Sequence, residues 1–301
     1  MEQNHKSGFI SLVGRPNVGK STIMNHLVGE KISIVSNKPQ TTRTKISGIY
    51  NDEESQIVFV DTPGMQSPRN KLGKYMLKAS KSSLHDTDVI VYVVDSSDFI
   101  GRMDKIIIEN LKQTSQTKIL LINKIDEITK DEVLSRIAMY SEIGIFDEII
   151  PISAMKGENM EAIVPTLKKY LVYGPKFYPE EMSTDQSLKV MVSEMIREKI
   201  LLYTQEEIPH GTMVQIEVLK ERKEKDIIDV EAVIFCERDT HKRIIIGKDG
   251  RKLKGIGMAA RKDLEELLGK QVNLSLWIKV KKNWRDNQNH IRSFGFDEKE
   301  I

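Results

Sequence analysis

The pattern of hydrophobic positions divides the chain into two parts that have different element orders. In the first part, short runs rich in Val and Ile alternate with longer amphipathic stretches. Short continuous apolar runs predict strands that are buried on both faces, and apolar positions spaced three and four apart predict helices. The strand-like runs are 9–13, 57–60, 89–94, 119–122 and 149–152, and the helical stretches are 21–28, 71–85, 103–112, 131–143 and 160–171.

Strands that alternate with helices predict an α/β domain, in which helices cover both faces of a mostly parallel sheet. Sheets of this kind bind ligands at the carboxyl ends of their strands. We therefore expect the functional residues of the first part to follow its strands directly.

The periodicity stops near Tyr173, where two prolines, a glycine and an acidic stretch are typical of a linker. The second part begins with a long amphipathic helix and contains two strands, a helix and a third strand, predicted at 188–203, 213–219, 227–235, 251–268 and 272–280. This order predicts a smaller α+β domain, with the charged stretch 220–226 as a hairpin turn. We assign residues 1–174 to the first domain, 175–186 to the linker, and 187–301 to the second domain with its basic tail.

Amino-acid composition says more about the cellular compartment of this protein than about its binding partner. The 301 residues are 39% hydrophobic, which is enough for two cores, and the net charge of +2 favours no partner. The single cysteine, Cys236, allows no intramolecular disulfide, and its apolar neighbours predict a buried side chain in a reducing compartment. No signal-peptide pattern is present, and no apolar run approaches the ~20 residues of a membrane span. We expect a cytoplasmic location.

A Gly-x-x-x-x-Gly-Lys-Ser motif lies between the first predicted strand and the first predicted helix. Its glycines let the main chain wrap around phosphates, so that successive N–H groups and the helix N-terminus face them. Lys20 supplies a positive charge to the β- and γ-phosphates, and the Ser21 hydroxyl is expected to bind magnesium. We predict nucleotide contacts for Gly14, Arg15, Pro16, Asn17, Val18, Gly19, Lys20 and Ser21.

An Asp-Thr-Pro-Gly sequence ends the next buried strand. Asp61 can hold magnesium directly or through water, and Gly64 can turn its N–H toward the γ-phosphate. Met65 then stands where many GTPases carry a glutamine that orients water. Because a thioether cannot orient water, we predict slow intrinsic hydrolysis. The predicted nucleotide contacts here are Asp61, Thr62, Pro63, Gly64 and Met65.

An Asn-Lys-x-Asp sequence after a later strand predicts the base. The Asp126 carboxylate can accept hydrogen bonds from N1–H and the amino group of guanine, which adenine cannot donate. Asn123 is expected to reach the opposite edge of the base, and the Lys124 stem to cover its face. Ser153 and Ala154 follow the last strand, where main-chain N–H groups can contact guanine O6. The predicted ligands are therefore GTP and GDP, with Mg²⁺.

The polar loop 38–44 contains threonines that can bind magnesium only while the γ-phosphate is present, which would make the loop a switch. Thr42 is the first choice for this ligand and Thr41 the second. The predicted metal ligands are thus Ser21, Thr42 and Asp61. The predicted catalytic residues are Lys20, Asn17, Thr42 and Gly64.

The second domain carries a Gly-x-x-Gly turn, 247–250, between an apolar run and a helix. Such turns are common, but residues 238–262 hold nine Lys or Arg side chains and only two carboxylates. A glycine turn lets a nucleic-acid backbone approach closely, and the cations neutralise its phosphates. We predict RNA contacts for Arg238, Lys242, Ile246, Gly247, Lys248, Asp249, Gly250, Arg251, Lys252, Lys281, Lys282 and Trp284.

Two alternatives remain at this basic region. It can be a solvated face of a module that binds something other than RNA. Trp284 can be either a core residue or a platform for base stacking, whereas Trp277 alternates with aliphatic residues and is expected in the core.

These motifs together resemble the Era family of bacterial GTPases, within the wider Era/TrmE group of translational GTPases. The first-domain motifs are common to related GTPases, and the second set, 237–250 and 280–285, is what distinguishes the Era family. A tandem-GTPase relative would need a second phosphate loop, and a tRNA-modifying relative would carry helical domains around the GTPase. The resemblance implies a Ras-like P-loop GTPase domain followed by a type II KH domain.

The resemblance also implies partners. They are the 3′ region of 16S ribosomal RNA and the 30S ribosomal subunit, whose assembly the protein would assist, together with peripheral contact with the inner membrane. DNA binding is not implied, and a monomer is expected. Asn17 resembles the asparagine that holds K⁺ near the phosphates in potassium-stimulated GTPases.

Three functional hypotheses follow. In the first, GTP orders the segments 38–44 and 61–71 and thereby changes the affinity of the KH domain for RNA. In the second, the basic domain docks on a protein or on an anionic membrane surface. In the third, the protein is a nucleotide hydrolase without a macromolecular partner, which the missing glutamine disfavours.

Overall fold

The computed structural model describes residues 5–223 and 225–296. In its described part, from residue 5 onward, the first domain has the strands β1 (Lys6–Gly14), β2 (Ile46–Asn51), β3 (Ser55–Asp61), β4 (Val89–Val94), β5 (Thr117–Ile122), β6 (Glu148–Pro151) and β7 (Val172–Tyr173). Its α-helices are α1 (Lys20–Val28), α2 (Lys71–Ser82), α3 (Arg102–Lys112), α4 (Lys130–Ser141) and α5 (Ile163–Tyr170).

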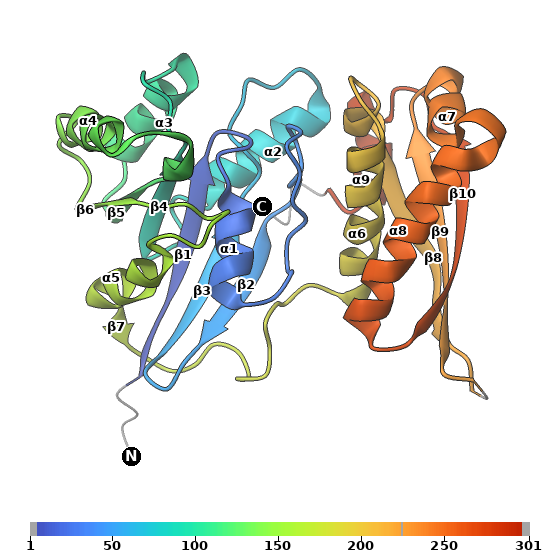
Figure 1. Ribbon diagram of the computed structural model, residues 1–301, viewed down its shortest axis with the longest axis horizontal. Helices are drawn as coiled ribbons and strands as arrows, with labels where there is room; N and C mark the ends of the chain where they lie inside the picture. The colour runs from blue at the N-terminus through green and yellow to red at the C-terminus, as the bar shows by residue number, and fades with distance from the viewer. Residues whose placement is uncertain (1–4, 224, 297–301) are drawn as a thin grey trace.

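The strands form one sheet in the order β2-β3-β1-β4-β5-β6, with β7 added to β1 (Figure 1). The central strands are parallel, while β2 and β7 are antiparallel to their neighbours. Side chains of α1 and α5 fill the core on one face, and side chains of α3 and α4 fill the core on the other. The predicted mostly parallel sheet with helices on both faces is confirmed.

Local sequence explains the central elements. Strand β4 reads Val-Ile-Val-Tyr-Val-Val, and every side chain is buried because helices cover both faces of the sheet. Helix α4 begins with a capping box, in which Thr129 and Glu132 satisfy each other's main-chain N–H groups. The carboxyl ends of β1, β3 and β5 lie at one edge of the sheet, and the predicted motifs follow them there.

The second domain has α6 (Leu188–Tyr203), β8 (Met213–Glu221), β9 (Ile227–Cys236), α7 (Asp239–Ile246), α8 (Arg251–Leu268), β10 (Gln271–Val280) and a C-terminal α9 (Gln288–Ser293). Its sheet has the order β10-β9-β8, with β9 and β10 parallel and β8 antiparallel to β9. Helices α6 and α8 pack on this sheet (Figure 1). The α+β prediction is confirmed, and Cys236 is buried and unpaired as expected. The hairpin turn lies between β8 and β9, although Glu224 in that turn is outside the described residues.

Helix α7 was not predicted, because its last residues form the β-branched run Ile244–Ile246. It is a helix because Ile245 inserts into the core of the second domain while Ile244 points outward and is 43% exposed. Tertiary packing therefore overrides the strand propensity of the isoleucines.

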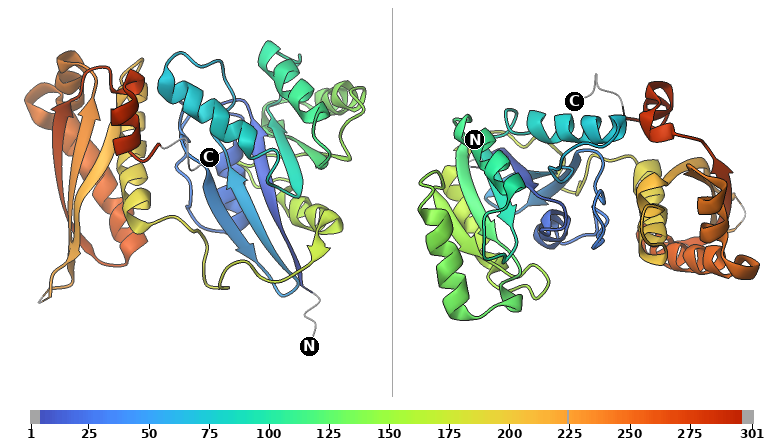
Figure 2. Two further views of the ribbon diagram at one scale, coloured as in Figure 1. Left: turned by 180° about the vertical axis from the view of Figure 1, so that it is seen from behind. Right: turned by 90° about the horizontal axis from the view of Figure 1, so that it is seen from above.

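The C-terminal segment joins the two domains. Trp284, Ile291 and Phe296 form a small core with Leu72 and Met76 of α2. Figure 2 shows α9 on the side of the second domain that faces α2. Among the described residues, no helix has both the length and the apolar character needed to cross a bilayer.

Candidate functional site

The phosphate loop connects β1 to α1 and is shaped by Gly19. This residue has a φ of 104°, and a Cβ atom there would lie 2.2 Å from Nδ2 of Asn123, so only glycine fits. The Lys20 ammonium donates to the carbonyl oxygens of Gly14 at 3.4 Å and Arg15 at 3.1 Å. The Lys20 ammonium therefore lies against the main chain of the phosphate loop, where it can contact a bound phosphate.

Burial destabilises the positive charge of Lys20 in the phosphate loop. Burial lowers the pKa of Lys20 from its usual value, and the carboxylate of Asp61 opposes that effect only in part. A buried ammonium in this condition is stabilised by any anion that enters the pocket. The loop is therefore built to receive phosphate.

Four side chains converge at the ends of β3 and α1. The Asp61 carboxylate accepts hydrogen bonds from the hydroxyls of Ser21 at 2.6 Å, Ser33 at 3.1 Å and Thr42 at 3.1 Å. Thr42 Oγ1 also lies 3.1 Å from Ser21 Oγ. Ser33 belongs to no motif, and nothing in the local sequence indicates its contact with Asp61.

The donor set of this cluster fits a hard divalent cation. All four groups are oxygen donors, which Mg²⁺ prefers. Burial raises the pKa of Asp61, and its Oδ1 atom is buried without a hydrogen-bond partner among the described residues. A cation next to Asp61 would satisfy both the charge and the unpaired oxygen.

The structure also distinguishes the two candidate threonines. The Thr41 hydroxyl donates to the carbonyl oxygen of Lys38 at 2.6 Å, which makes it part of a local turn. Only Thr42 lies beside Ser21 and Asp61. The first choice of ligand, Thr42, is the one that the geometry favours.

The base-recognition residues follow β5 and β6. Asp126 is exposed in the pocket, where the Ser153 hydroxyl donates to its Oδ1 at 2.5 Å. Lys124 adopts a left-handed conformation with a φ of 68°. Asn123 also lines the pocket, where its amide donates to Val18 O at 2.7 Å and accepts from Ala154 N at 2.9 Å. Asn123 thus joins the phosphate loop to the segment after β6, and its second amide N–H leaves the contact with the base as a prediction.

One pocket collects most of the predicted nucleotide residues, namely Pro16, Asn17, Gly19, Lys20, Ser21, Thr42, Gly64, Asn123, Lys124, Asp126 and Ala154. Its lining also includes residues that were not assigned, namely Thr22, Ile34, Val35, Ser36, Asn37, Gln40, Glu127 and Met155. Thr22 follows the phosphate loop and could have been included from its position. Residues 34–37 carry no motif, and only the path of the folded loop brings them to the pocket.

One predicted nucleotide contact, Met65, requires correction, and a second, Arg15, is limited to its main chain. The Arg15 guanidinium pairs with Asp95 and Asp104, both at 2.9 Å, and so only its main chain can face the phosphates. Burial alone would lower the pKa of Arg15, but these two carboxylates raise it. The Met65 side chain is 1% exposed and packs in the core under β4 and β5, so it does not contact the nucleotide.

The Gly-x-x-Gly turn joins α7 to α8 in the second domain. Gly247 has a φ of 73°, and a Cβ atom there would lie 2.7 Å from Cβ of Lys252. The side chains of Lys248 and Arg251 at the turn are exposed, as is that of Arg238 at the start of α7. Two of the predicted cations therefore flank the main-chain turn.

The burial of the two tryptophans decides between the roles considered for Trp284 and overturns the one expected for Trp277. Trp284 is fully buried and donates from Nε1 to Gly211 O at 2.9 Å, so its assignment to the RNA-binding surface is wrong. Trp277 is 46% exposed on β10, which contradicts its expected core position. Lys281 is half-buried, with its ammonium 4.6 Å from the ring centre of Phe294.

Comparison with protein families matches both domains. The family described as a 50S ribosome-binding GTPase matches residues 9–124, and the KH domain family matches residues 207–285. Over 295 residues the chain is 56% identical to GTPase Era of Clostridioides difficile strain 630, covering 98% of this chain and 99% of that protein. The chain belongs to the Era family of GTPases. Era of Alkaliphilus oremlandii is 50% identical over 97% of this chain and 99% of its own length.

Two solved Era structures have the same fold. Era in complex with MgGDPNP and nucleotides 1506–1542 of 16S ribosomal RNA is 39% identical, with a TM-score of 0.94 over 97% of this chain and 99% of that one. A variant of Aquifex aeolicus Era bound to GDP and AlF₄⁻ is also 39% identical, with a TM-score of 0.93 and the same coverage. The chain is therefore a GTP- and GDP-binding GTPase of the Era family, with an N-terminal Ras-like domain and a C-terminal KH domain.

Proposed function

We propose that this Era-family GTPase binds the 3′ region of 16S ribosomal RNA through its KH domain and assists assembly of the 30S subunit under the control of GTP. The observation that carries the proposal is the Era structure with TM-score 0.94, whose RNA ligand is nucleotides 1506–1542 of 16S ribosomal RNA. The exposed cations around Gly247 support it, because they suit a phosphate backbone. Membrane association, cytoplasmic location and a monomeric state stay predictions.

In the proposed hydrolysis site, Ser21, Thr42 and Asp61 would hold Mg²⁺. When bound, the ion would neutralise charge on the β- and γ-phosphates. Lys20 would bind the same phosphates, while Gly64 packs on the main chain of Pro16 and would present its N–H to the γ-phosphate. Met65, which stands in place of the water-orienting glutamine, is buried in the core and cannot supply that role. Hydrolysis is therefore slow without a further positive group.

We propose that K⁺ supplies that group beside Asn17. The Asn17 amide donates to Asn37 O at 2.7 Å, which places the phosphate loop next to the carbonyl groups of the loop 34–37. We expect GTP hydrolysis in K⁺ buffer to be about 10-fold faster than in Na⁺ buffer, well below the 10³–10⁵ of an arginine finger. The variant Asn17→Ala should lose this difference and keep the Na⁺ rate. Equal rates of the unchanged protein in both buffers would contradict the proposal.

Contacts between the domains support control by GTP. The loop 31–43 lies against α6, where Glu198 accepts from Val35 N at 3.0 Å and from the Lys31 ammonium at 2.7 Å. Downstream of the Asp-Thr-Pro-Gly motif, Asp286 accepts from Lys71 N at 3.1 Å. Both segments that can sense a γ-phosphate thus touch the second domain. A nucleotide that reorders them would change the position or mobility of the KH domain.

RNA binding is tested with a 16S fragment that covers the 3′ region and a scrambled fragment of equal length. We expect the double variant Lys248→Ala/Arg251→Ala to bind the cognate fragment more weakly, and the slope of log affinity against log salt to fall by about 0.7 for each lost contact with single-stranded RNA. Lys223→Ala removes an exposed lysine from the hairpin turn and should change neither quantity.

Vesicles that contain anionic lipid form the second arm of this test. Preference for the cognate fragment supports the proposed function. Equal binding of both fragments, or binding to vesicles alone, would contradict it.

A further inference from the structure

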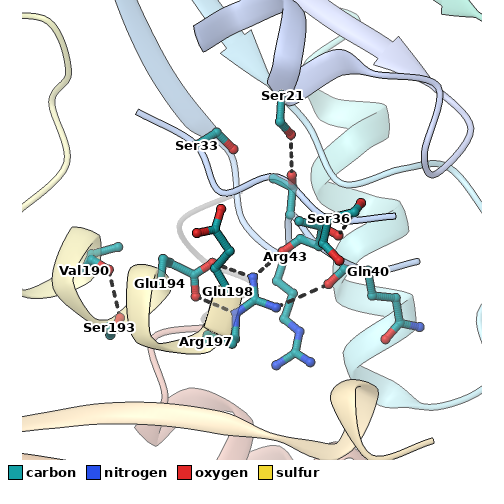
Figure 3. A network of polar contacts seen from close by, with 12 residues as sticks. Ser21, Ser33, Ser36, Gln40, Arg43, Val190, Ser193, Glu194, Arg197 and Glu198 are labelled. Carbon is teal, nitrogen blue, oxygen red and sulfur yellow. Dashed lines mark hydrogen bonds and ion pairs between the residues drawn. The ribbon is translucent and has the colours of Figure 1, made fainter. Parts of the chain in front are cut away.

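The main chain on both sides of Thr42 is held by the second domain. On one side, α6 presents Arg197, a side chain that is fully buried. Its Nη1 donates to Gln40 O at 3.4 Å, and its Nη2 donates to the carbonyl oxygen of Thr41 (Figure 3). A residue of the KH domain therefore binds the peptide groups just before Thr42.

On the other side, Arg43 extends from the first domain into the second. Its Nη1 donates to Thr212 O at 2.6 Å, and its Nη2 donates to His210 O at 3.0 Å. Arg43 is 3% exposed and lies over the ring of Trp284. Burial first, and then the charge of Arg197, lower the pKa of Arg43. Two guanidinium groups thus cross the interface in opposite directions, one on each side of Thr42.

The Arg197 guanidinium is itself fixed in direction. Glu194, one turn earlier on α6, accepts from Nε at 2.8 Å and also from Nη2 (Figure 3). A planar guanidinium can bind a carboxylate on one side and two carbonyl groups on the other, whereas an ammonium group cannot span both. The chemistry of this position therefore requires arginine.

These contacts act on the hydrolysis site through one short segment. Thr42 Oγ1 lies 3.1 Å from Ser21 Oγ and 3.1 Å from Asp61 Oδ2, so a small shift of residues 40–43 would remove the hydroxyl from the cluster. Displacement of a reacting or positioning group by ~1 Å can slow a reaction about 100-fold. Helix α6, the first helix of the second domain, is therefore placed to govern the rate of GTP hydrolysis in the first domain.

We propose that Arg197 is a positioning residue for GTP hydrolysis, holding the Gln40 and Thr41 carbonyls so that the Thr42 hydroxyl faces the magnesium and γ-phosphate site. This inference rests on the proposed role of Thr42. It makes the KH domain part of the GTPase machinery, because an isolated first domain would lack this support.

The test compares full-length Arg197→Gln, Arg197→Lys and Thr42→Ala with the unchanged protein. Arg261→Gln is the control, since Arg261 on α8 also pairs with a glutamate of its own helix, Glu265, but is exposed to solvent. Fluorescent GDP and a non-hydrolysable GTP analogue report binding in Mg²⁺, and single-turnover assays with saturating protein in excess of GTP report hydrolysis. We expect Arg197→Gln to slow hydrolysis about 10- to 100-fold and to weaken binding of the analogue while GDP affinity stays unchanged. Arg197→Lys should be intermediate.

If Arg197→Gln does not fold, Glu194→Gln replaces it, because that change frees the guanidinium without opening a cavity. The Glu194→Gln variant should also bind the analogue more weakly and hydrolyse GTP more slowly, but both effects should be smaller than those of Arg197→Gln. A folded Arg197→Gln variant with unchanged hydrolysis and analogue affinity would overturn the inference. Equal loss of GDP and analogue affinity would also overturn it, since that result indicates general support of the fold. An unaffected Thr42→Ala variant would instead refute the proposed role of Thr42.

Discussion

Replacing Asp126 by asparagine should weaken GTP binding by about 10²–10⁴-fold, because two hydrogen bonds from guanine to a charged group are weakened or lost at about 1.5–3 kcal/mol each. The carboxylate is exposed in the pocket, and the Ser153 hydroxyl at 2.5 Å holds one of its oxygens in place. An amide of the same shape keeps the packing but places a donor where guanine also donates. Titration with a fluorescent GTP derivative measures the effect.

Asp131→Asn is the matched control for this variant. Asp131 is an exposed carboxylate in the first turn of α4, and its replacement should leave GTP affinity unchanged. ATP should compete poorly for the unchanged protein. GTP affinity that survives in Asp126→Asn would show that guanine is selected elsewhere in the pocket.

Truncating Trp284 to alanine should lower the free energy of unfolding by about 3–5 kcal/mol, the usual cost of removing a large buried aromatic side chain. The ring is fully buried against α2 side chains, and its loss leaves Gly211 O without the Nε1–H donor. Because this core joins the domains, α2 and the C-terminal segment should also separate more easily. Urea unfolding followed by circular dichroism measures the change.

Trp277→Ala provides the comparison, since Trp277 is 46% exposed on β10. Its free energy of unfolding should fall by about 1 kcal/mol or less, as for other changes outside a packed core. Losses of similar size in the two variants would contradict the structural assignment of these side chains.

Periodicity predicts most of the sheet of the first domain, because its central strands are short continuous apolar runs that are buried on both faces. It does not predict β2, whose sequence Ile-Ser-Gly-Ile-Tyr-Asn lies at the sheet edge with partly exposed side chains. Periodicity does not predict helix α7 for a different reason. Its isoleucines favour a strand, but the packing of Ile245 in the core of the second domain stabilises the helix. The hydrophobic pattern along the sequence does not predict an element whose structure depends on its exposure at a sheet edge or on tertiary packing.

In the candidate site, sequence motifs identify some residues and not others. They identify Lys20 and Asp126, because binding phosphate and guanine requires particular residue types at fixed spacings. They do not identify Ser33, which reaches Asp61 through the path of the loop, nor Arg197, which lies on a helix of the other domain. Contacts that depend on how two domains meet leave no local pattern.

The central claim is that GTP and RNA binding are coupled through the interface between the domains, and RNA affinity in three nucleotide states tests it most directly. The cognate 16S fragment should bind the GTP-analogue and GDP forms with affinities that differ about 5- to 150-fold, and RNA should change the relative nucleotide affinities by the same factor. Identical RNA affinities with GTP analogue, with GDP and without nucleotide would contradict the account.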